Sequence, residues 1–247
     1  MAFFEGSIFS ESLGVSTSVC VLLPTDTEKT PKSGFPVLYL LHGIFENHTA
    51  WLRSTSVDLL AQRYGFAVIM PEAGRSYYTD MKYGLKYFSY ISDELPNFCR
   101  KSFNISKECG KTFIAGTSMG GYGALKAGLR RPDIFGAFAG LSGAADIKKR
   151  ADDYKNRPEM RAAFGEPAVL PDDDDLFKLA EKRDNIRHPV LIHCGLSDTR
   201  LEENRALYKK LIENGFDVTY KETDGGHDWA YWQRILPDVM EFFLSHL

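Results

Sequence analysis

The sequence predicts an α/β protein with a mostly parallel β-sheet that is covered by helices on both faces. Short apolar runs, rich in β-branched and aromatic residues, alternate with longer stretches of helical composition. Such alternation is typical of a parallel sheet with helical crossovers. The middle runs are apolar throughout, which fits strands that are buried on both faces.

The individual elements follow from local signals. The run at residues 16–24 alternates polar and apolar residues, which favours a more exposed antiparallel strand near the start of the chain. Gly65 and Gly215 each follow a helical stretch, where glycine commonly ends a helix. The predicted strands are residues 16–24, 36–43, 66–73, 111–116, 136–143, 189–195 and 216–223. The predicted helices are residues 51–65, 86–103, 119–132, 201–215 and 229–247.

We expect a single domain over residues 1–247, because neither an internal repeat nor a linker-like tract interrupts the chain. One irregular segment, residues 144–187, breaks the alternation of strand and helix. We interpret it as a small insertion over the carboxyl edge of the sheet, since connections this long are often lids or binding loops. Its four consecutive aspartates, residues 172–175, lack the spacing and turn glycine of a calcium loop, so we expect a solvated loop or helix start.

Composition and charge exclude several classes of protein. The chain is 44% hydrophobic and carries a net charge of −3, so no basic surface favours nucleic acid or an anionic membrane. No apolar run approaches the roughly 18 residues of a membrane helix, and the first residues do not resemble a signal peptide. The four cysteines form no CxxC pair, which favours reduced thiols in a cytoplasmic protein. A Cys99–Cys109 disulfide is the alternative if the chain is exported.

No metal and no cofactor are expected, because the sequence contains neither a phosphate-binding glycine loop nor a zinc-type cluster. The expected partner is a small molecule. The sequence leaves a homo-oligomer open.

Residues 116–121, GTSMGG, place Ser118 between glycines at −2 and +2. A predicted strand precedes this motif and a predicted helix follows it, which is the context of a nucleophile elbow. The sharp turn would hold Ser118 in a strained backbone conformation. We expect Gly116 and Gly120 to be required, because a Cβ at either position would collide across the turn. The motif alone favours a small residue in a tight turn over a nucleophile, and only its context reverses this.

A nucleophilic serine needs a base, and His227 is the strongest of the six histidines. It lies in a Gly-Gly loop after the last predicted strand, where it can reach the sheet edge. The acid should follow the preceding strand, which ends at Asp198 and would fix the imidazole tautomer. Asp224 and Asp228 are rivals on the histidine loop, interpreted as loop-shaping or solvated. The order Ser118, Asp198, His227 is the one found with a nucleophile elbow.

Two backbone N–H groups are predicted to form an oxyanion hole. Met119 opens the helix after the serine, and Ile44 follows an earlier strand that ends in His42-Gly43. Gly43 would let the backbone approach the substrate, while His42 is expected to hydrogen-bond the loop. Four separate features thus agree on a catalytic serine.

The substrate pocket is predicted from aromatic residues in loops at the carboxyl edge, although each is more often a core or rim residue. Bulky walls would favour short acyl chains, and a sugar-linked ester stays open because aromatic faces suit sugar rings. The predicted pocket residues are Trp51, Tyr77, Tyr78 and Trp229.

The segments HGIFENHTAW, GTSMGGYGALKAGLRRPDIF, HCGLSD and GGHDWAYW resemble the esterase D branch of the α/β-hydrolases, most closely the bacterial tributyrin-esterase type. The resemblance covers nearly the whole chain. It implies an eight-stranded α/β-hydrolase fold and a carboxylesterase that hydrolyses short-chain acyl esters. It assigns Ser118, Asp198 and His227 to the catalytic triad and Ile44 and Met119 to the oxyanion hole.

Several alternatives share this architecture. S-formylglutathione hydrolases of this branch carry a cysteine in the segment after the oxyanion glycine, and IFENHTAW has none. Acetylxylan esterases, feruloyl esterases and acyltransferases such as the mycolyltransferases look related, so the fold does not settle the substrate. A non-catalytic binding protein on this fold is a further alternative, against which the complete set of candidate residues argues.

Overall fold

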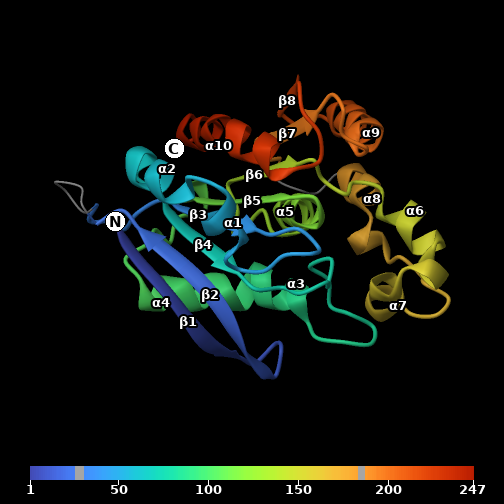
Figure 1. Cartoon of the computed structure of the whole chain (residues 1–247), viewed down its shortest axis with the longest axis horizontal. Coiled ribbons are helices and arrows are strands. Elements are labelled where there is room, and N and C mark those ends of the chain that lie inside the picture. Colours follow the sequence, from blue (N-terminus) through green and yellow to red (C-terminus); the bar gives the residue numbers. More distant parts are fainter. Residues whose placement is uncertain (26–30, 183–186) are drawn as a thin grey trace.

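The computed structural model describes residues 1–25, 31–182 and 187–247 and contains an eight-stranded sheet (Figure 1). The strand order is β1-β2-β4-β3-β5-β6-β7-β8. β2 runs antiparallel to both β1 and β4, and all other neighbouring strands are parallel. The strands are β1 (Ala2–Ser10), β2 (Val15–Leu23), β3 (Val37–Leu41), β4 (Ala67–Pro71), β5 (Thr112–Thr117), β6 (Ala137–Leu141), β7 (Val190–Gly195) and β8 (Val218–Thr223).

Seven of these strands match the predicted runs, and the predicted mostly parallel sheet is confirmed. β1 was not predicted; most of its residues are exposed, and Glu5, Gly6 and Ser7 interrupt its apolar residues. The antiparallel direction of β2 is confirmed, but its predicted exposure is wrong over its second half, which is buried. The reason is its place in the sheet, between β1 and β4.

Helices cover both faces of the sheet. Figure 1 shows α2 and α10 on one face and α4 on the other. Two separate hydrophobic clusters fill the space beneath them, one holding residues of α1, α2 and α10 and the other residues of α4, α5 and α9. The α-helices are α1 (Ala50–Ser54), α2 (Val57–Tyr64), α3 (Tyr87–Ser89), α4 (Leu95–Ser102), α5 (Met119–Arg130), α6 (Ile147–Asp152), α7 (Pro158–Phe164), α8 (Leu176–Glu181), α9 (Leu201–Glu213) and α10 (Trp229–Leu244). A π-helical turn (Tyr90–Glu94) and 3₁₀ turns (Cys109–Lys111, Tyr154–Asn156, Asp172–Asp174) complete them.

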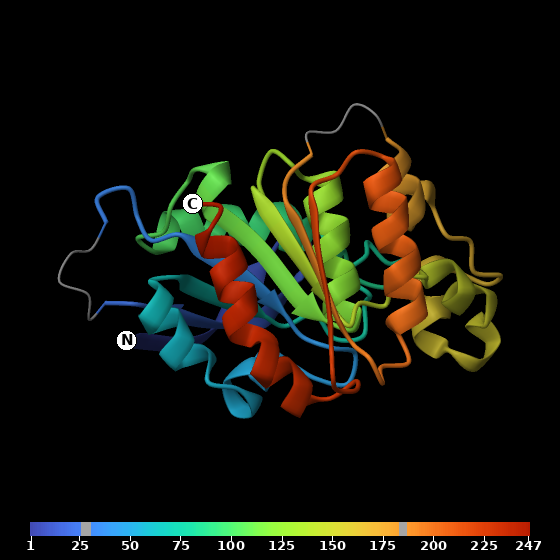
Figure 2. The ribbon, with the colours of Figure 1, turned by 90° about the horizontal axis from the view of Figure 1, so that it is seen from above.

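The irregular segment 144–187 folds into α6, α7 and α8, and its residues 183–186 lie outside the described residues. Figures 1 and 2 show these helices gathered at one end of the molecule, beside α5 and α9. The segment begins at the carboxyl edge of the sheet, where the Ala144 N–H donates to the Ser118 carbonyl at 3.0 Å. It therefore flanks the centre of the sheet edge from one side.

The aspartates at residues 172–175 are more structured than predicted. Asp175 caps α8, accepting from the backbone N–H groups of Phe177 and Lys178, which fits the predicted helix start. Asp174 is buried and forms an ion pair of 2.8 Å with the fully buried ammonium of Lys126, so the prediction of a solvated run is wrong there. Burial lowers the pKa of Lys126 to about 8, although the Asp174 carboxylate acts against this shift.

All four cysteines are free, so the Cys99–Cys109 pairing is absent from this structure. No helix within the described residues is long and apolar enough to cross a bilayer.

Candidate active site

Ser118 lies between the end of β5 and the start of α5, at the carboxyl edge of the sheet. Its backbone has φ 53° and ψ −114°, a region that residues with a side chain rarely adopt. The Ser118 N–H donates to the Leu141 carbonyl of the neighbouring β6 at 3.0 Å, which holds this conformation in place. The residue is 8% exposed, so it is almost completely buried.

The glycines around Ser118 make this turn sterically feasible. A Cβ on Gly116 would lie 2.5 Å from the Gly120 carbonyl carbon. A Cβ on Gly120 would lie 2.5 Å from the Leu41 carbonyl oxygen, at the end of β3. Real Cβ contacts are never this short, so the predicted requirement for glycine at both positions is confirmed.

The structure brings together Ser118, His227 and Asp198, whose positions are far apart in the sequence. His227 Nε2 lies 2.9 Å from Ser118 Oγ, and His227 Nδ1 lies 3.0 Å from both carboxylate oxygens of Asp198. The Asp198 side chain has no exposed surface, and its Oδ1 also accepts from the Arg200 N–H at 2.8 Å. A buried carboxylate so placed selects the tautomer with a proton on Nδ1, which leaves the Nε2 lone pair facing the serine.

The rival aspartates have other contacts. Asp228 caps α10, where its Oδ1 accepts from the Tyr231 N–H at 2.9 Å. Asp224 is exposed, and its backbone carbonyl accepts from the guanidinium of Arg234. Both residues shape the loop that carries His227, as the sequence indicated.

The His227 ring is also held by packing. Trp232, one turn into α10, meets it edge-on with 5.1 Å between ring centroids. The Trp232 indole N–H in turn donates to Ser142 Oγ at 3.2 Å. Sequence reasoning missed Trp232, although its position three residues after Trp229 places both rings on the same side of a helix.

The loop after β3 brings its backbone close to Ser118. An added Cβ on Gly43 would lie 3.8 Å from Ser118 Cβ, so the two chains approach closely. Among the described residues, the N–H groups of Ile44 and Met119 have no hydrogen-bond acceptor. The N–H of Met119 belongs to the first turn of α5, where helices leave donors unpaired. Free donors on both sides of Ser118 are what an oxyanion hole requires.

His42 fixes the ends of two neighbouring strands, as predicted for a structural histidine. Its Nδ1 donates to the Gly43 carbonyl at 2.7 Å, and its Nε2 accepts from the Ala73 N–H at 3.0 Å. Burial lowers the pKa of His42, which favours the neutral ring that can make both bonds.

Glu46 was not identified from the sequence. Its Oε2 accepts from the Gly43 N–H at 3.2 Å, while its Oε1 accepts from the Trp229 indole N–H at 2.6 Å. The Glu46 carboxylate thus connects the loop that contains Ile44 to the start of α10, which begins two residues after His227. The only signal in the sequence was an acidic residue three positions after the glycine.

The predicted pocket residues separate into two groups. Trp51 and Tyr78 are fully buried, which leaves no surface for a substrate to touch, so their prediction as pocket walls is corrected. The Trp51 indole N–H donates to the Leu41 carbonyl, and the Tyr78 hydroxyl donates to the His42 carbonyl, so both stabilise the base of the loop. Tyr77 is also buried and packs edge-on against Tyr122 in α5.

Trp229 differs from the other three because it is only partly buried and lies two residues after His227. Its ring packs edge-on against both Trp51 and Trp232, at centroid distances of 5.0 and 5.1 Å. Of the four predicted residues, Trp229 is the one that the structure leaves partly exposed.

This arrangement has a defined chemical capability. A hydroxyl that is hydrogen-bonded to a neutral imidazole can lose its proton while it attacks an electrophilic carbon. A buried carboxylate on the other ring nitrogen stabilises the imidazolium that forms.

Comparison with known proteins agrees with this geometry. Residues 10–243 match the Esterase family model, described as "Putative esterase". The chain is 33% identical to an acetyl esterase of Caldicellulosiruptor saccharolyticus, over 98% of both chains. Among solved structures, the fluorophosphonate-binding serine hydrolase F of Staphylococcus aureus superposes with a TM-score of 0.90 at 29% identity. An S-formylglutathione hydrolase of Staphylococcus aureus superposes with a TM-score of 0.88, also at 29% identity. Each of these two matches covers 98% of this chain and 98% of the other chain. The chain therefore belongs to the esterase family and has the α/β-hydrolase fold.

Proposed function

We propose that the protein is a serine carboxylesterase that hydrolyses short-chain acyl esters through an acyl-enzyme intermediate. The observation that carries this proposal is the continuous hydrogen-bond chain from Ser118 Oγ through His227 to Asp198. Family membership supports ester hydrolysis as the reaction class.

In the proposed acylation step, Ser118 Oγ attacks the ester carbonyl while its proton passes to His227 Nε2. The carbonyl oxygen becomes an oxyanion and accepts hydrogen bonds from the backbone N–H groups of Ile44 and Met119. His227 then gives the proton to the departing alcohol, which leaves an acyl group on Ser118. Asp198 stabilises the positive imidazolium during both transfers.

Deacylation repeats these steps with water. His227 removes a proton from the water as it attacks the acyl carbonyl, and the same two N–H groups hold the second oxyanion. His227 finally returns the proton to Ser118 Oγ, which releases the carboxylic acid. Three rings and one carboxylate keep the imidazole and the loop in place throughout: Trp51, Trp229, Trp232 and Glu46.

A small acyl pocket is supported by two observations. The acetyl esterase of Caldicellulosiruptor saccharolyticus is similar over 98% of its length. The partly buried Trp229, clamped between two other indoles, is a rigid wall beside His227. We therefore propose a preference for acetyl to butyryl groups, as in esterases of the tributyrin type.

Thioester hydrolysis is the second candidate, because several similar proteins are named S-formylglutathione hydrolases, among them one at 29% and one at 24% identity. The loop segment IFENHTAW lacks the cysteine expected of that activity. Acyl transfer uses the same intermediate and differs only in the acceptor.

These candidates are separated by measuring kcat/KM for one alcohol across acetyl, butyryl, octanoyl and feruloyl esters, together with S-formylglutathione. We expect a maximum at acetyl to butyryl, with graded changes of about 1–3 kcal/mol per methylene in activation free energy. A maximum at octanoyl or longer, or activity confined to feruloyl esters or S-formylglutathione, would overturn the pocket proposal. Product analysis with added alcohol distinguishes hydrolysis from transfer, and Ser118→Ala is the control for background hydrolysis.

A further inference from the structure

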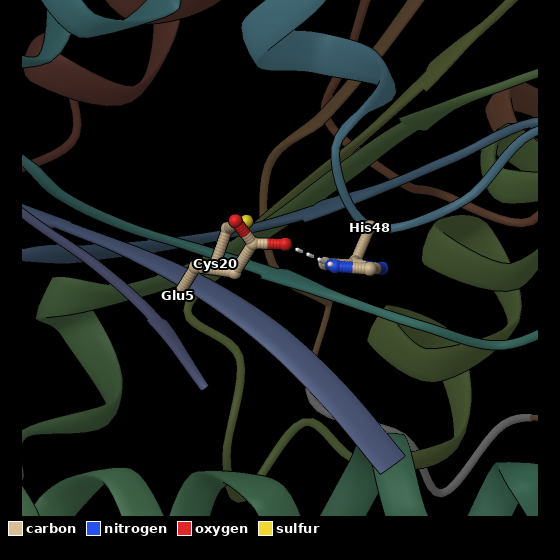
Figure 3. A group of neighbouring side chains, drawn as sticks. All are labelled: Glu5, Cys20 and His48. Atoms are coloured by element: carbon tan, nitrogen blue, oxygen red, sulfur yellow. Dashed lines mark hydrogen bonds and ion pairs between the residues drawn. The ribbon is translucent and has the colours of Figure 1, made fainter. Parts of the chain in front are cut away.

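Three side chains with metal-binding atoms meet on the β1–β2 hairpin, away from Ser118 (Figure 3). Glu5 in β1 and Cys20 in β2 are direct cross-strand partners, so their side chains point to the same face of the sheet. His48 comes from the loop between β3 and α1 and directs its ring at Glu5, as Figure 3 shows. The carboxylate oxygen, the thiol sulfur and an imidazole nitrogen all lie within 4.8 Å of one another.

Carboxylate, thiolate and imidazole are the three ligand types that proteins use for Zn²⁺. Ligand atoms around tetrahedral zinc lie roughly 3.3–3.8 Å apart, given bond lengths of about 2.0–2.3 Å. His48 Nε2 and Glu5 Oε1 are 3.0 Å apart, so a small rotation of the exposed Glu5 side chain opens the required space. We propose that Glu5, Cys20 and His48 bind a zinc ion, with a solvent molecule as the fourth ligand.

The far side of the His48 ring supports this assignment. Its Nδ1 lies 3.3 Å from Glu72 Oε2, and the His48 backbone N–H donates to the same oxygen at 3.2 Å. A proton held on Nδ1 by this carboxylate leaves the Nε2 lone pair directed at Glu5 and Cys20. Metal-binding histidines are oriented by a carboxylate in this way, and loss of that carboxylate typically weakens binding 10–100-fold.

The Cys20 side chain is completely buried beneath the other two ligands. Zinc binds a cysteine as the thiolate: the S–H bond breaks, a Zn–S bond forms, and the proton passes to solvent.

An ion at this position would link the hairpin to the loop that contains Ile44, four residues before His48. Glu5 and Cys20 belong to the antiparallel edge of the sheet, whereas His48 belongs to the loop that follows the central strand β3. Because zinc would bind the folded chain in preference to the unfolded one, the melting temperature should rise with metal concentration.

Co²⁺ is the probe for this site, since it takes zinc ligands and absorbs light. One equivalent added to the full chain should give visible bands of tetrahedral Co²⁺ and a near-ultraviolet thiolate-to-metal band, and Zn²⁺ should abolish both. Cys20→Ser should remove the thiolate band. Cys109→Ser is the matched control and should keep it, because Cys109 also lies near a histidine, 3.9 Å from His188 Nε2.

Zinc affinity, measured by competition with a chelating dye, should fall at least 100-fold in His48→Ala and about 10–100-fold in Glu72→Gln. Zinc should raise the melting temperature of the wild type and of Cys109→Ser, but not of His48→Ala. If circular dichroism shows that Cys20→Ser is misfolded, Glu5→Gln in the exposed strand β1 is the substitute variant. It should weaken zinc binding at least 10-fold. A wild-type protein without the thiolate band, or a band that persists in Cys20→Ser, would overturn the proposal.

Discussion

The β5–α5 turn and the β1–β2 hairpin are both sharp reversals of the chain, yet neighbouring backbone restricts them very differently. At the turn, an added Cβ on Gly120 would meet the Leu41 carbonyl oxygen at 2.5 Å. In the hairpin, an added Cβ on Gly6 would meet no atom within 4 Å. β1 has a single neighbour and an exposed outer edge, whereas β5 lies between two strands and is completely buried. Residues far away in the sequence, in β3 and β6, therefore constrain the geometry of the turn, whereas the hairpin pairs two consecutive segments and leaves its outer strand unconstrained.

The largest effect should appear in catalysis, at the carboxylate that supports the serine of the β5–α5 turn through His227. Asp198→Asn should lower kcat by about 10⁴, because an amide at this position favours the wrong tautomer of His227, as it does in serine proteases. Asp224→Asn, on the same edge but exposed, should change kcat less than threefold. Steady-state kinetics on a short-chain ester measure both, and the assignment of the acid is wrong if Asp224→Asn is the more damaging change.

Substitution by alanine should affect protein stability very differently at Gly120 and at Gly6. Gly120→Ala should lower the free energy of unfolding by about 3 kcal/mol or more, because the new Cβ forces the start of α5 and the end of β3 apart. Gly6→Ala should change it by less than about 1 kcal/mol and has room to be stabilising, since alanine loses less backbone entropy than glycine. Denaturant unfolding of the two variants tests the comparison, and equal losses would contradict it.

A smaller effect is expected at Glu46, which connects the loop of Ile44 to Trp229. Glu46→Gln replaces one of two acceptor oxygens with a donor, so either the Gly43 N–H or the Trp229 indole loses its partner. We expect kcat to fall about tenfold with KM within threefold, because the loop donors act mainly on the oxyanion. Glu241→Gln, an exposed change at the far end of α10, is the control. A rise in KM at unchanged kcat would instead place Glu46 in substrate binding.

The parts of the molecule that could be predicted from the sequence are those whose structure depends on neighbouring residues in the chain. The seven predicted strands are continuous apolar runs or alternate regularly, and the glycines around Ser118 stand at fixed offsets from it. Asp198 and His227 each follow a strand of a parallel sheet, so their positions at one edge follow from the topology. These features depend on residues close together in the chain, which is why they could be predicted.

The features that were missed depend on distant partners. Glu46 and Trp229 are 183 residues apart, and no spacing rule connects them. The burial of Trp51 and Tyr78 depends on which way each loop turns, which aromatic composition does not specify. Glu5 and Cys20 become neighbours only when the edge strand β1 pairs with β2, and His48 joins them from the loop after β3.

The central claim is that Ser118 carries the acyl group during ester hydrolysis. Rapid acid quenching during turnover of a short-chain ester, followed by intact-protein and peptide mass spectrometry, tests this directly. We predict one acyl adduct per chain, located on the peptide that contains Ser118. Ser118→Ala should show no adduct, with kcat reduced on the order of 10⁶-fold and an unchanged fold by circular dichroism. An adduct on another residue, or a Ser118→Ala variant that keeps a tenth of wild-type activity, would contradict the account.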